Sequence, residues 1–261
     1  MANNNIKVSL HGSVIGLDFS NNLVIDGRRA VNNRGATNVA PRVELIDDFL
    51  GDVIADQWDA KTGSDGSVVT PTINVQANGA VRLTTGAGAT TTMAVNGVQL
   101  QGSLNFFANK DNLVFECRLK AAAVTSVAIF VGLTDQVSSL EMPVNGSGSG
   151  NGITTTATDA VGFVFDTTMT DASFWCTGVA NDVDGTHVTS SVAPVAATYN
   201  YLRIEIDSSG NATFYIDGSR VGYVASAVTI TVGLTPCVAI FRRSASSTTL
   251  DVDYIRIAQD R

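Results

Sequence analysis

Residues 201–223 read YLRIEIDSSGNATFYIDGSRVGY, and this stretch decides the fold. Every second residue is apolar from Leu202 to Ile206, and the same alternation returns from Ala212 to Ile216. A period of two predicts strands with one buried and one solvated face. Ser-Ser-Gly after the first run and Asp-Gly after the second predict turns. The stretch is therefore predicted to form a strand, a turn, a second strand and a second turn.

The same period of two recurs along most of the chain. It runs from Leu113 to Leu119 and from Leu250 to Tyr254. The run from Val127 to Leu133 is apolar at every position and predicts a central strand. No long stretch shows the 3.6-residue period of a helix. Many short strands over about 220 residues predict one all-β domain, an antiparallel β-sandwich or jelly roll, rather than two domains.

The composition excludes several classes of protein. The chain has 16 basic and 24 acidic residues, a formal net charge of -8, and 44% hydrophobic residues. This hydrophobic content excludes intrinsic disorder, and the acidic balance argues against nucleic acid as a partner. The longest apolar stretch, Ala121 to Leu133, is interrupted by Thr125 and Ser126 and is shorter than the roughly 20 residues of a membrane-spanning helix. We therefore expect neither a nucleic acid nor a membrane as partner.

The cysteines and the N-terminus indicate folding in a reducing compartment. The first residues lack the basic and apolar regions of a signal peptide. Cys117, Cys176 and Cys237 each lie in an apolar run, so we expect three buried free thiols. No two cysteines are close in sequence, and His11 and His187 are isolated, which argues against a zinc site. No metal or other cofactor is predicted.

Two long breaks interrupt the strand pattern. Residues 85–92 are rich in Gly and Thr, and residues 145–158 begin with NGSGSGNG. The second break is too long for a tight hairpin. It is expected to be either a mobile surface loop or a loop that a partner orders.

Residues 1–40 differ from the remainder, 41–261, which is predicted to be the jelly roll. They contain short apolar pieces but are too few for a core of their own. We interpret them as an arm that docks on the main domain, on a sister subunit or on a larger assembly, and the alternative is a first strand pair of the same sandwich. The predicted assembly contacts are apolar anchors, with arginines that pair with an acidic neighbour: Ile6, Val8, Leu10, Ile15, Leu17, Phe19, Leu23, Ile25, Arg28, Arg29 and Arg34.

Three segments carry a family resemblance. Asp48-Phe49, followed by Trp58, resembles the opening of a concanavalin A-like domain. Residues 201–223 resemble the strand-turn-strand-turn of lectin and laminin-G-like jelly rolls, and LDVDYIRI at Leu250–Ile257 resembles their closing strand. The resemblance implies an architecture and says little about function, since one fold hosts many activities.

The resemblance covers roughly residues 43–258. The chain is also similar in composition and organisation to phage-encoded virion proteins. It has few charges, many Ala, Val, Thr and Gly residues, and an arm ahead of a jelly roll. This second resemblance implies folding in the host cytoplasm and a final location in the virion.

Two alternating pairs of acidic residues are candidates for glycoside hydrolase chemistry. Hydrolases with the concanavalin A-like fold carry a strand with acidic residues at alternate positions, and retaining chemistry needs two carboxyls about 5 Å apart. Glu205 and Asp207 alternate, but Ser209 takes the third place. Asp251 and Asp253 alternate near the C-terminus without a third acid. We therefore predict no catalytic residues and no enzyme.

These acids are expected to lie on a solvated face or to form salt bridges with Arg203 or Arg242. No Ser-His-Asp arrangement and no phosphate-binding glycine loop is visible. The sequence NDVDG at residues 181–185 is typical of either a calcium loop or an Asx-type turn, and it lacks the full ligand pattern of the former. Trp58 and Trp175 are candidate glycan contacts, with core packing as the alternative.

Two functions follow from these observations. The first is a non-enzymatic virion structural protein that decorates or cements a phage capsid, or forms part of a tail or fibre. Its partners would be other copies of itself, as a trimer or dimer, and a major capsid or other virion protein. The alternative is a carbohydrate-binding, lectin-like module or host-surface adhesin, with a glycan as partner.

Overall fold

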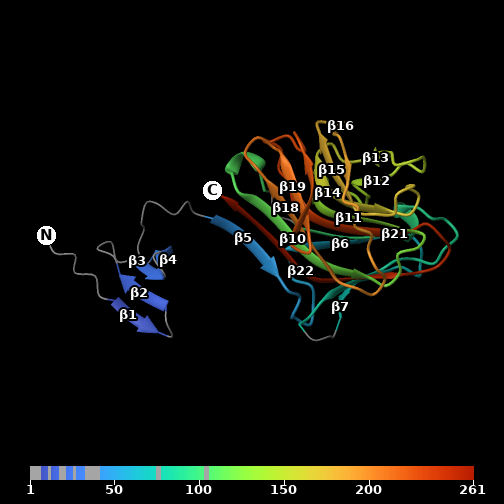
Figure 1. Ribbon diagram of the computed structural model, residues 1–261. Helices are drawn as coiled ribbons and strands as arrows, with labels where there is room; N and C mark the ends of the chain where they lie inside the picture. The colour runs from blue at the N-terminus through green and yellow to red at the C-terminus, as the bar shows by residue number, and fades with distance from the viewer. Residues whose placement is uncertain are drawn as a thin grey trace. The chain divides into compact units, whose positions relative to one another are not determined.

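The computed structural model describes residues 7–10, 13–17, 22–25, 28–32, 42–74, 78–102 and 106–261. The chain forms two compact units, one of Met1–Arg42 with Arg261 and the other of Val43–Asp260 (Figure 1). In the first unit the described pairing is an antiparallel sheet in the order β1-β2-β3-β4. These strands are β1 (Lys7–Leu10), β2 (Ser13–Leu17), β3 (Asn22–Ile25) and β4 (Arg28–Asn32).

The larger unit is a sandwich of two eight-stranded sheets, as the sequence predicts (Figure 1). Sheet 1 has the order β20-β19-β18-β10-β22-β8-β7, and β5 also pairs with β22. Sheet 2 has the order β16-β15-β14-β11-β21-β9-β6, and β17 also pairs with β15. The registers described in both sheets are antiparallel, which confirms the predicted antiparallel β-sandwich.

The strands of sheet 1 are β5 (Arg42–Asp47), β7 (Val69–Ile73), β8 (Val81–Thr84), β10 (Leu113–Ala121), β18 (Asn200–Ile206), β19 (Ala212–Ile216), β20 (Ser219–Val224) and β22 (Thr249–Asp260). The strands of sheet 2 are β6 (Trp58–Thr62), β9 (Val98–Gly102), β11 (Val127–Thr134), β14 (Ala160–Asp166), β15 (Trp175–Ala180), β16 (Val183–Asp184), β17 (Val188–Thr189) and β21 (Thr235–Arg242). Three short elements complete the description: α1 (Met93–Asn96), η1 (Ala108–Lys110) and the hairpin of β12 (Val144–Gly146) with β13 (Ile153–Thr155).

The stretch that decides the fold forms β18, β19 and β20. In β18 the residues from Asn200 to Ile206 alternate strictly between buried and half-buried, which is the pattern that the sequence predicts. The turn between β19 and β20 places Asp217 at φ 50° and Gly218 at φ 81°. Two successive positive φ angles define the type I′ hairpin turn, whose twist matches that of the flanking strands.

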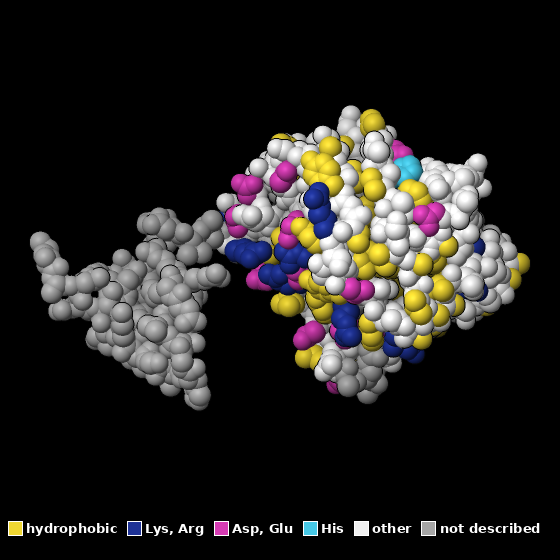
Figure 2. Space-filling view, in the orientation of Figure 1, with side chains coloured by type: hydrophobic (Ala, Val, Ile, Leu, Met, Phe, Trp, Pro, Cys, Tyr) yellow, Lys and Arg dark blue, Asp and Glu magenta, His cyan; other side chains and the backbone are white. Residues whose placement is uncertain are grey.

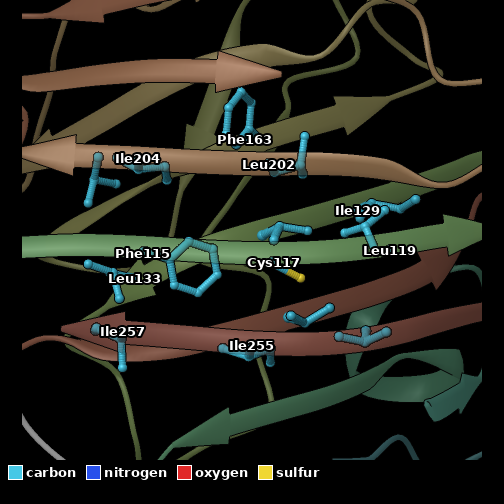
Figure 3. Packing of buried hydrophobic residues seen from close by; sticks show 14 of the residues in the cluster. Phe115, Cys117, Leu119, Ile129, Leu133, Phe163, Leu202, Ile204, Ile255 and Ile257 are labelled. Carbon is cyan, nitrogen blue, oxygen red and sulfur yellow. The ribbon is translucent and has the colours of Figure 1, made fainter. Parts of the chain in front are cut away.

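The main core lies between the two sheets (Figure 3). Phe163 of β14 packs edge-on against Phe214 of β19, with ring centroids 5.2 Å apart, and against Phe174, at 6.1 Å. Edge-to-face contacts of this kind stabilise beyond the area that they bury. The predicted central strand, β11, lies between β14 and β21 and is buried along its whole length.

A second apolar cluster covers the outer face of sheet 2. Phe130 of β11 and Phe241 of β21 point outward and pack in one cluster with Met142, which precedes β12, and with Val144, the first residue of β12. The hairpin begins at Val144 and otherwise lies within the second sequence break, residues 145–158. Part of that segment is therefore paired strand rather than the loop that its glycine content predicts.

The three cysteines are free and buried, as predicted. Burial raises the pKa of Cys117 well above its ordinary value and raises the pKa values of Cys176 and Cys237 to about 12. Among the residues described, no helix has the length and apolar character needed to cross a membrane.

Candidate functional site

A pocket of about 370 Å³ opens between α1, the segment before β12 and the end of β21. This volume lies within the range of small-molecule sites, roughly 300–1,000 Å³. The polar and aromatic side chains that line it include Thr92, Glu141, Asn145, Thr156, Phe241 and Arg243. Met93, Leu140 and Met142 add apolar surface. The pocket therefore joins an apolar wall to several hydrogen-bonding groups.

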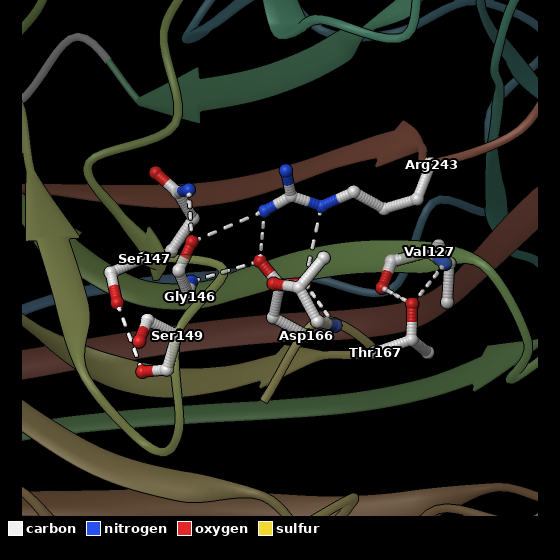
Figure 4. A network of polar contacts seen from close by, with 9 residues as sticks. Val127, Gly146, Ser147, Ser149, Asp166, Thr167 and Arg243 are labelled. Atoms are coloured by element: carbon white, nitrogen blue, oxygen red, sulfur yellow. Dashed lines mark hydrogen bonds and ion pairs between the residues drawn. The ribbon is translucent and has the colours of Figure 1, made fainter. Parts of the chain in front are cut away.

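One wall of the pocket is fixed by a buried ion pair (Figure 4). Asp166, the last residue of β14, accepts hydrogen bonds from Nε and Nη2 of Arg243, and its side chain has no exposed surface. It also accepts from the backbone N–H of Gly146 at 2.8 Å and of Thr168 at 3.0 Å. The carboxylate thereby ties the hairpin strand β12 to the edge of the pocket.

The ring of Phe241, which is 4% exposed, is held by the same guanidinium. The guanidinium of Arg243 lies over the ring of Phe241, 4.6 Å from its centroid. A guanidinium that stacks on an aromatic face is attracted by the ring quadrupole. Because Asp166 and Phe241 both engage it, Arg243 is positioned before any ligand binds.

Glu141 supplies the unsatisfied polar group of the site. Its Oε1 atom is buried and has no hydrogen-bond partner among the described residues. Burial, followed by the charge of Asp135, raises the pKa of this carboxyl. The backbone N–H of Glu141 donates to Oε1 of Gln99 at 3.0 Å, which anchors the segment on β9. A buried carboxyl oxygen without a partner is costly, and the cost is smaller when the carboxyl is protonated.

Buried amides continue the polar surface beneath Glu141. Nε2 of Gln99 donates to Oε1 of Gln101 at 3.0 Å, and Nε2 of Gln101 donates to the carbonyl of Val137 at 2.9 Å. Lys61 of β6 donates to the same carbonyl at 2.5 Å. These contacts hold the segment that follows β11 against the outer face of β9.

The structure places both tryptophans in apolar surroundings. Trp58 is 7% exposed, packs on Phe49 and donates its indole N–H to Asp47 at 2.7 Å. It lines a separate pocket of about 380 Å³. Trp175 is 6% exposed and donates its indole N–H to the carbonyl of Asp171 at 3.1 Å. Their role as glycan contacts stays a prediction, and neither ring lines the pocket of Glu141.

The alternating acids near residues 205 and 251 form ion pairs. Glu205 accepts from Arg203 and from the hydroxyl of Tyr215. Asp251 pairs with Arg82 at 2.6 Å, and Asp253 pairs with Arg118 at 2.7 Å. The sequence predicts a solvated face or salt bridges with Arg203 or Arg242 for these acids, and Arg203 does bind Glu205.

Asp207 and Arg242 have local roles. Asp207 accepts from the backbone N–H of Ser209 and of Asn211 and so stabilises the turn after β18. Arg242 does not bind these acids and instead donates to the carbonyls of Thr125 and Ser246.

Of residues 181–185, Asn181 and Asp182 form the turn between β15 and β16, and the other three are β16 and the residue after it. Asn181 and Asp182 have φ angles of 52° and 64°, and the backbone N–H of Asp182 donates to the carbonyl of Thr158. His187 lies beside this turn, with Nδ1 3.7 Å from Asp184 and Nε2 2.9 Å from the carbonyl of Asn151. No group of three or more potential metal ligands occurs in the described part of the chain.

The predicted assembly residues fall in the first unit. Val8, Leu10, Ile15, Leu17, Leu23, Ile25, Arg28 and Arg29 lie on its four strands. Ile6, Phe19 and Arg34, together with His11, lie outside the described residues. The assembly role of the arm stays a prediction.

Sequence reasoning missed Glu141, Asp166 and Arg243. Their proximity depends on contacts such as that between residues 166 and 243, which no local pattern reveals. One local signal existed, because Glu141 is a charge between Leu140 and Met142 in a chain with few charges. An acid between apolar residues is a candidate for burial, and hence for a shifted pKa.

No family model matches this sequence, and no curated protein matches it. Solved structures with the same fold do match. A β-glucanase of Bacillus licheniformis is 12% identical, with a TM-score of 0.56, over 84% of this chain and 98% of the other. A structure described with endo-acting O-glycanases of the human gut microbiota, which initiate mucin breakdown, is 10% identical, with a TM-score of 0.57, over 83% and 99%. The carbohydrate recognition domain of Emp47p is 8% identical, with a TM-score of 0.53, over 84% and 95%.

These similarities establish the fold, which is a jelly-roll β-sandwich like that of the β-glucanase and of the carbohydrate recognition domain. They also correct one prediction. The sequence predicted a protein that is not an enzyme, whereas the structural neighbours include several glycoside hydrolases. Enzymatic action on a glycan is therefore among the functions that this fold supports.

Proposed function

We propose that this protein binds a carbohydrate in the pocket beside Glu141. The observation that carries the proposal is a pocket of about 370 Å³ whose lining combines the Glu141 side chain, an amide and threonine hydroxyls with apolar side chains. A sugar presents hydroxyls to such polar groups and C–H groups to the apolar part of such a lining. The fold neighbours, which include a carbohydrate recognition domain, support the same conclusion.

The other lining groups extend the match to a polyhydroxylated ligand. Asn145 uses its amide nitrogen on the carbonyl of Gly146 at 2.9 Å, which leaves its carbonyl oxygen for another donor. Thr92 and Thr156 add hydroxyl groups at the pocket wall, each able to donate and to accept. A few fixed polar groups around an apolar floor are the usual composition of a small-molecule site.

A glycan array probed with the full chain, with and without calcium, tests the proposal. We expect binding to at least one glycan class that Glu141→Ala weakens tenfold or more. Asp182→Asn, which removes an exposed carboxylate in the β15–β16 turn, is the matched control and should bind like the wild type. Binding to no glycan, or equal binding by Glu141→Ala, would reject the proposed site.

Glycosidic cleavage is a second candidate, favoured by the raised pKa of Glu141. A general acid must hold its proton near the working pH, and burial beside a second carboxyl such as Asp135 has that effect. Release of reducing ends from the glycans that bind would show cleavage, and Glu141→Gln should abolish it. Binding without release leaves the carbohydrate-binding proposal intact and rejects cleavage.

The location in a virion stays a prediction. Neither the described contacts nor the compared structures bear on it.

A further inference from the structure

The outer face of sheet 1 differs from the rest of the molecule in composition. The outward side chains of five strands lie in rows across sheet 1, because paired residues stand opposite one another. These strands are β10, β18, β19, β20 and β22. All five tyrosines of the chain lie on this face: Tyr199, Tyr201, Tyr215, Tyr223 and Tyr254. We call this surface the tyrosine face.

One row of charged side chains crosses four neighbouring strands on the tyrosine face, β18, β10, β22 and β5. Arg203 binds Glu116 and Glu205, and Arg256 binds Glu116 at 3.1 Å and Glu44 at 2.6 Å. Figure 2 shows Lys and Arg side chains beside Asp and Glu side chains over the region where these strands run in Figure 1. Acidic and basic groups therefore alternate along the row.

A second group of ion pairs lies next to the first. Asp251 is bound by Arg82 at 2.6 Å and by Lys120 at 3.4 Å, and Arg118 binds Asp253 at 2.7 Å. The aromatic rings belong to the same network, since Arg118 lies over the ring of Tyr199, 4.1 Å from its centroid. The charges of the face are thus neutralised by one another before any partner arrives.

The near-equal number of basic and acidic side chains is confined to the tyrosine face. Residues 43–260 contain ten basic and 22 acidic residues. The two groups of ion pairs, together with Arg220 opposite Tyr215, hold six of the ten basic residues and five of the 22 acidic residues. The remainder of the unit has four basic residues against 17 acidic ones. Two copies that approach through the remainder repel each other, whereas two tyrosine faces do not.

The side chains are also those that protein interfaces favour. Tyr and Arg are enriched at the energetically dominant positions of interfaces, and Lys, which occurs once among these ion pairs, is depleted. The ion pairs hold the arginines in place, which lowers the entropic cost of ordering them on association. Tyr223 remains 46% exposed and offers a ring to a partner.

We propose that the tyrosine face is an interface between two copies of this chain, related by a twofold axis. A twofold contact brings a surface against itself, so it needs a surface that is self-complementary. A neutral face with alternating charges meets this requirement, and within the described residues the second apolar cluster covers only the other sheet. The contact lies away from the proposed carbohydrate pocket, so a dimer carries two pockets.

Sedimentation velocity on the full chain over a range of concentrations tests the proposal. We expect a dimer that the double variant Thr213→Asp/Tyr223→Asp weakens at least tenfold. Val183→Asp/Val195→Asp adds the same charge at two exposed valines outside the face, 64% and 61% exposed, and should leave the dimer unchanged. A wild type that stays monomeric, or a dimer that responds equally to both double variants, would overturn the proposal.

The salt dependence of the association distinguishes the twofold contact from a contact in which the tyrosine face binds an acidic surface of a neighbour. Screening weakens the repulsion between two acidic bodies that meet through neutral faces, so the proposed dimer should hold or tighten as salt rises. A complex that dissociates with added salt would show that the tyrosine face binds acidic groups instead, and would reject the twofold contact. Glycan binding is scored separately, so its failure does not affect this result.

Discussion

The side chain of Arg243, which follows the last residue of β21, binds the fully buried carboxylate of Asp166, the last residue of β14. The two strands are separated by β11 in sheet 2, so the pair spans the sheet from one side of its central strand to the other. Because the same carboxylate accepts from Gly146, the ion pair sets the position of the hairpin and of one pocket wall.

Removal of the carboxylate should destabilise the protein strongly. In Asp166→Ala, Arg243 loses its partner and the N–H groups of Gly146 and Thr168 lose their acceptor. Breaking a buried pair costs about 3–5 kcal/mol, and because Arg243 is 21% exposed we expect about 3 kcal/mol. Urea unfolding measures the change, with Asp182→Ala as the control in an exposed turn. A loss below about 0.5 kcal/mol, the range of ordinary surface substitutions, would contradict the assigned role.

Removal of the Phe163 ring from the main core should reduce the free energy of unfolding by a similar amount. Phe163→Ala leaves a cavity between the sheets and removes the edge contacts with Phe174 and Phe214. Substitutions of this kind cost about 3–5 kcal/mol of unfolding free energy. Denaturant unfolding of the variant and of Val183→Ala, an exposed control, gives the comparison. If both variants lose the same free energy, Phe163 does not have the packing described here.

Glu141 should make the protein less stable as the pH rises. Its pKa is raised in the folded state, by burial and then by Asp135, so the folded form holds the proton at pH values where the unfolded form has lost it. The destabilisation is absent below the ordinary value of 4.5 and develops as the pH rises through the folded pKa. Glu141→Gln removes the effect, so its stability relative to the wild type should increase with pH over that window. A constant difference would show that the carboxyl is not shifted.

Glu116 should make the protein less stable as the pH falls, which is the opposite of the effect of Glu141. Burial acts to raise its pKa, but hydrogen bonds from Arg256 and Tyr201 and the charges of Arg256 and Arg203 outweigh burial and lower the pKa. The stabilisation is complete above 4.5 and is lost as the pH falls through the folded pKa. Relative to the wild type, Glu116→Gln should be least stable near neutral pH and should recover in acid. Equilibrium unfolding at a series of pH values tests this, and an advantage of the wild type that grows in acid would contradict it.

The thiols should be unreactive until the chain unfolds. All three cysteines are buried, and burial raises each thiol pKa, so the nucleophilic thiolate is scarce. A thiol-specific disulfide reagent should label none of them in buffer and all three in denaturant. Rapid labelling of any one in buffer would indicate local opening of its strand.

The sequence predicts the sandwich because its main determinant is local. The strict alternation from Leu202 to Ile206 and the Asp217-Gly218 turn specify strands and a hairpin without reference to the rest of the chain. The same holds for the run from Val127, whose burial on both faces follows from its uniform apolar character.

The candidate site could not be predicted because its determinants are distant in sequence. The β12–β13 hairpin begins in a glycine-rich run that carries no alternation, and it is held by Asp166 and Arg243. Glu141 becomes buried only because the segment around it folds against Gln99. The shifted pKa is therefore a product of tertiary packing.

The first and last strands of the larger unit are neighbours, since β5 pairs with β22 and Glu44 binds Arg256. Its entry and exit points thus lie on two paired strands of sheet 1. A short linker could join residue 260 to residue 43 and new ends could be opened in an exposed turn such as 217–218, which makes the unit suited to circular permutation and to insertion into a loop of another protein.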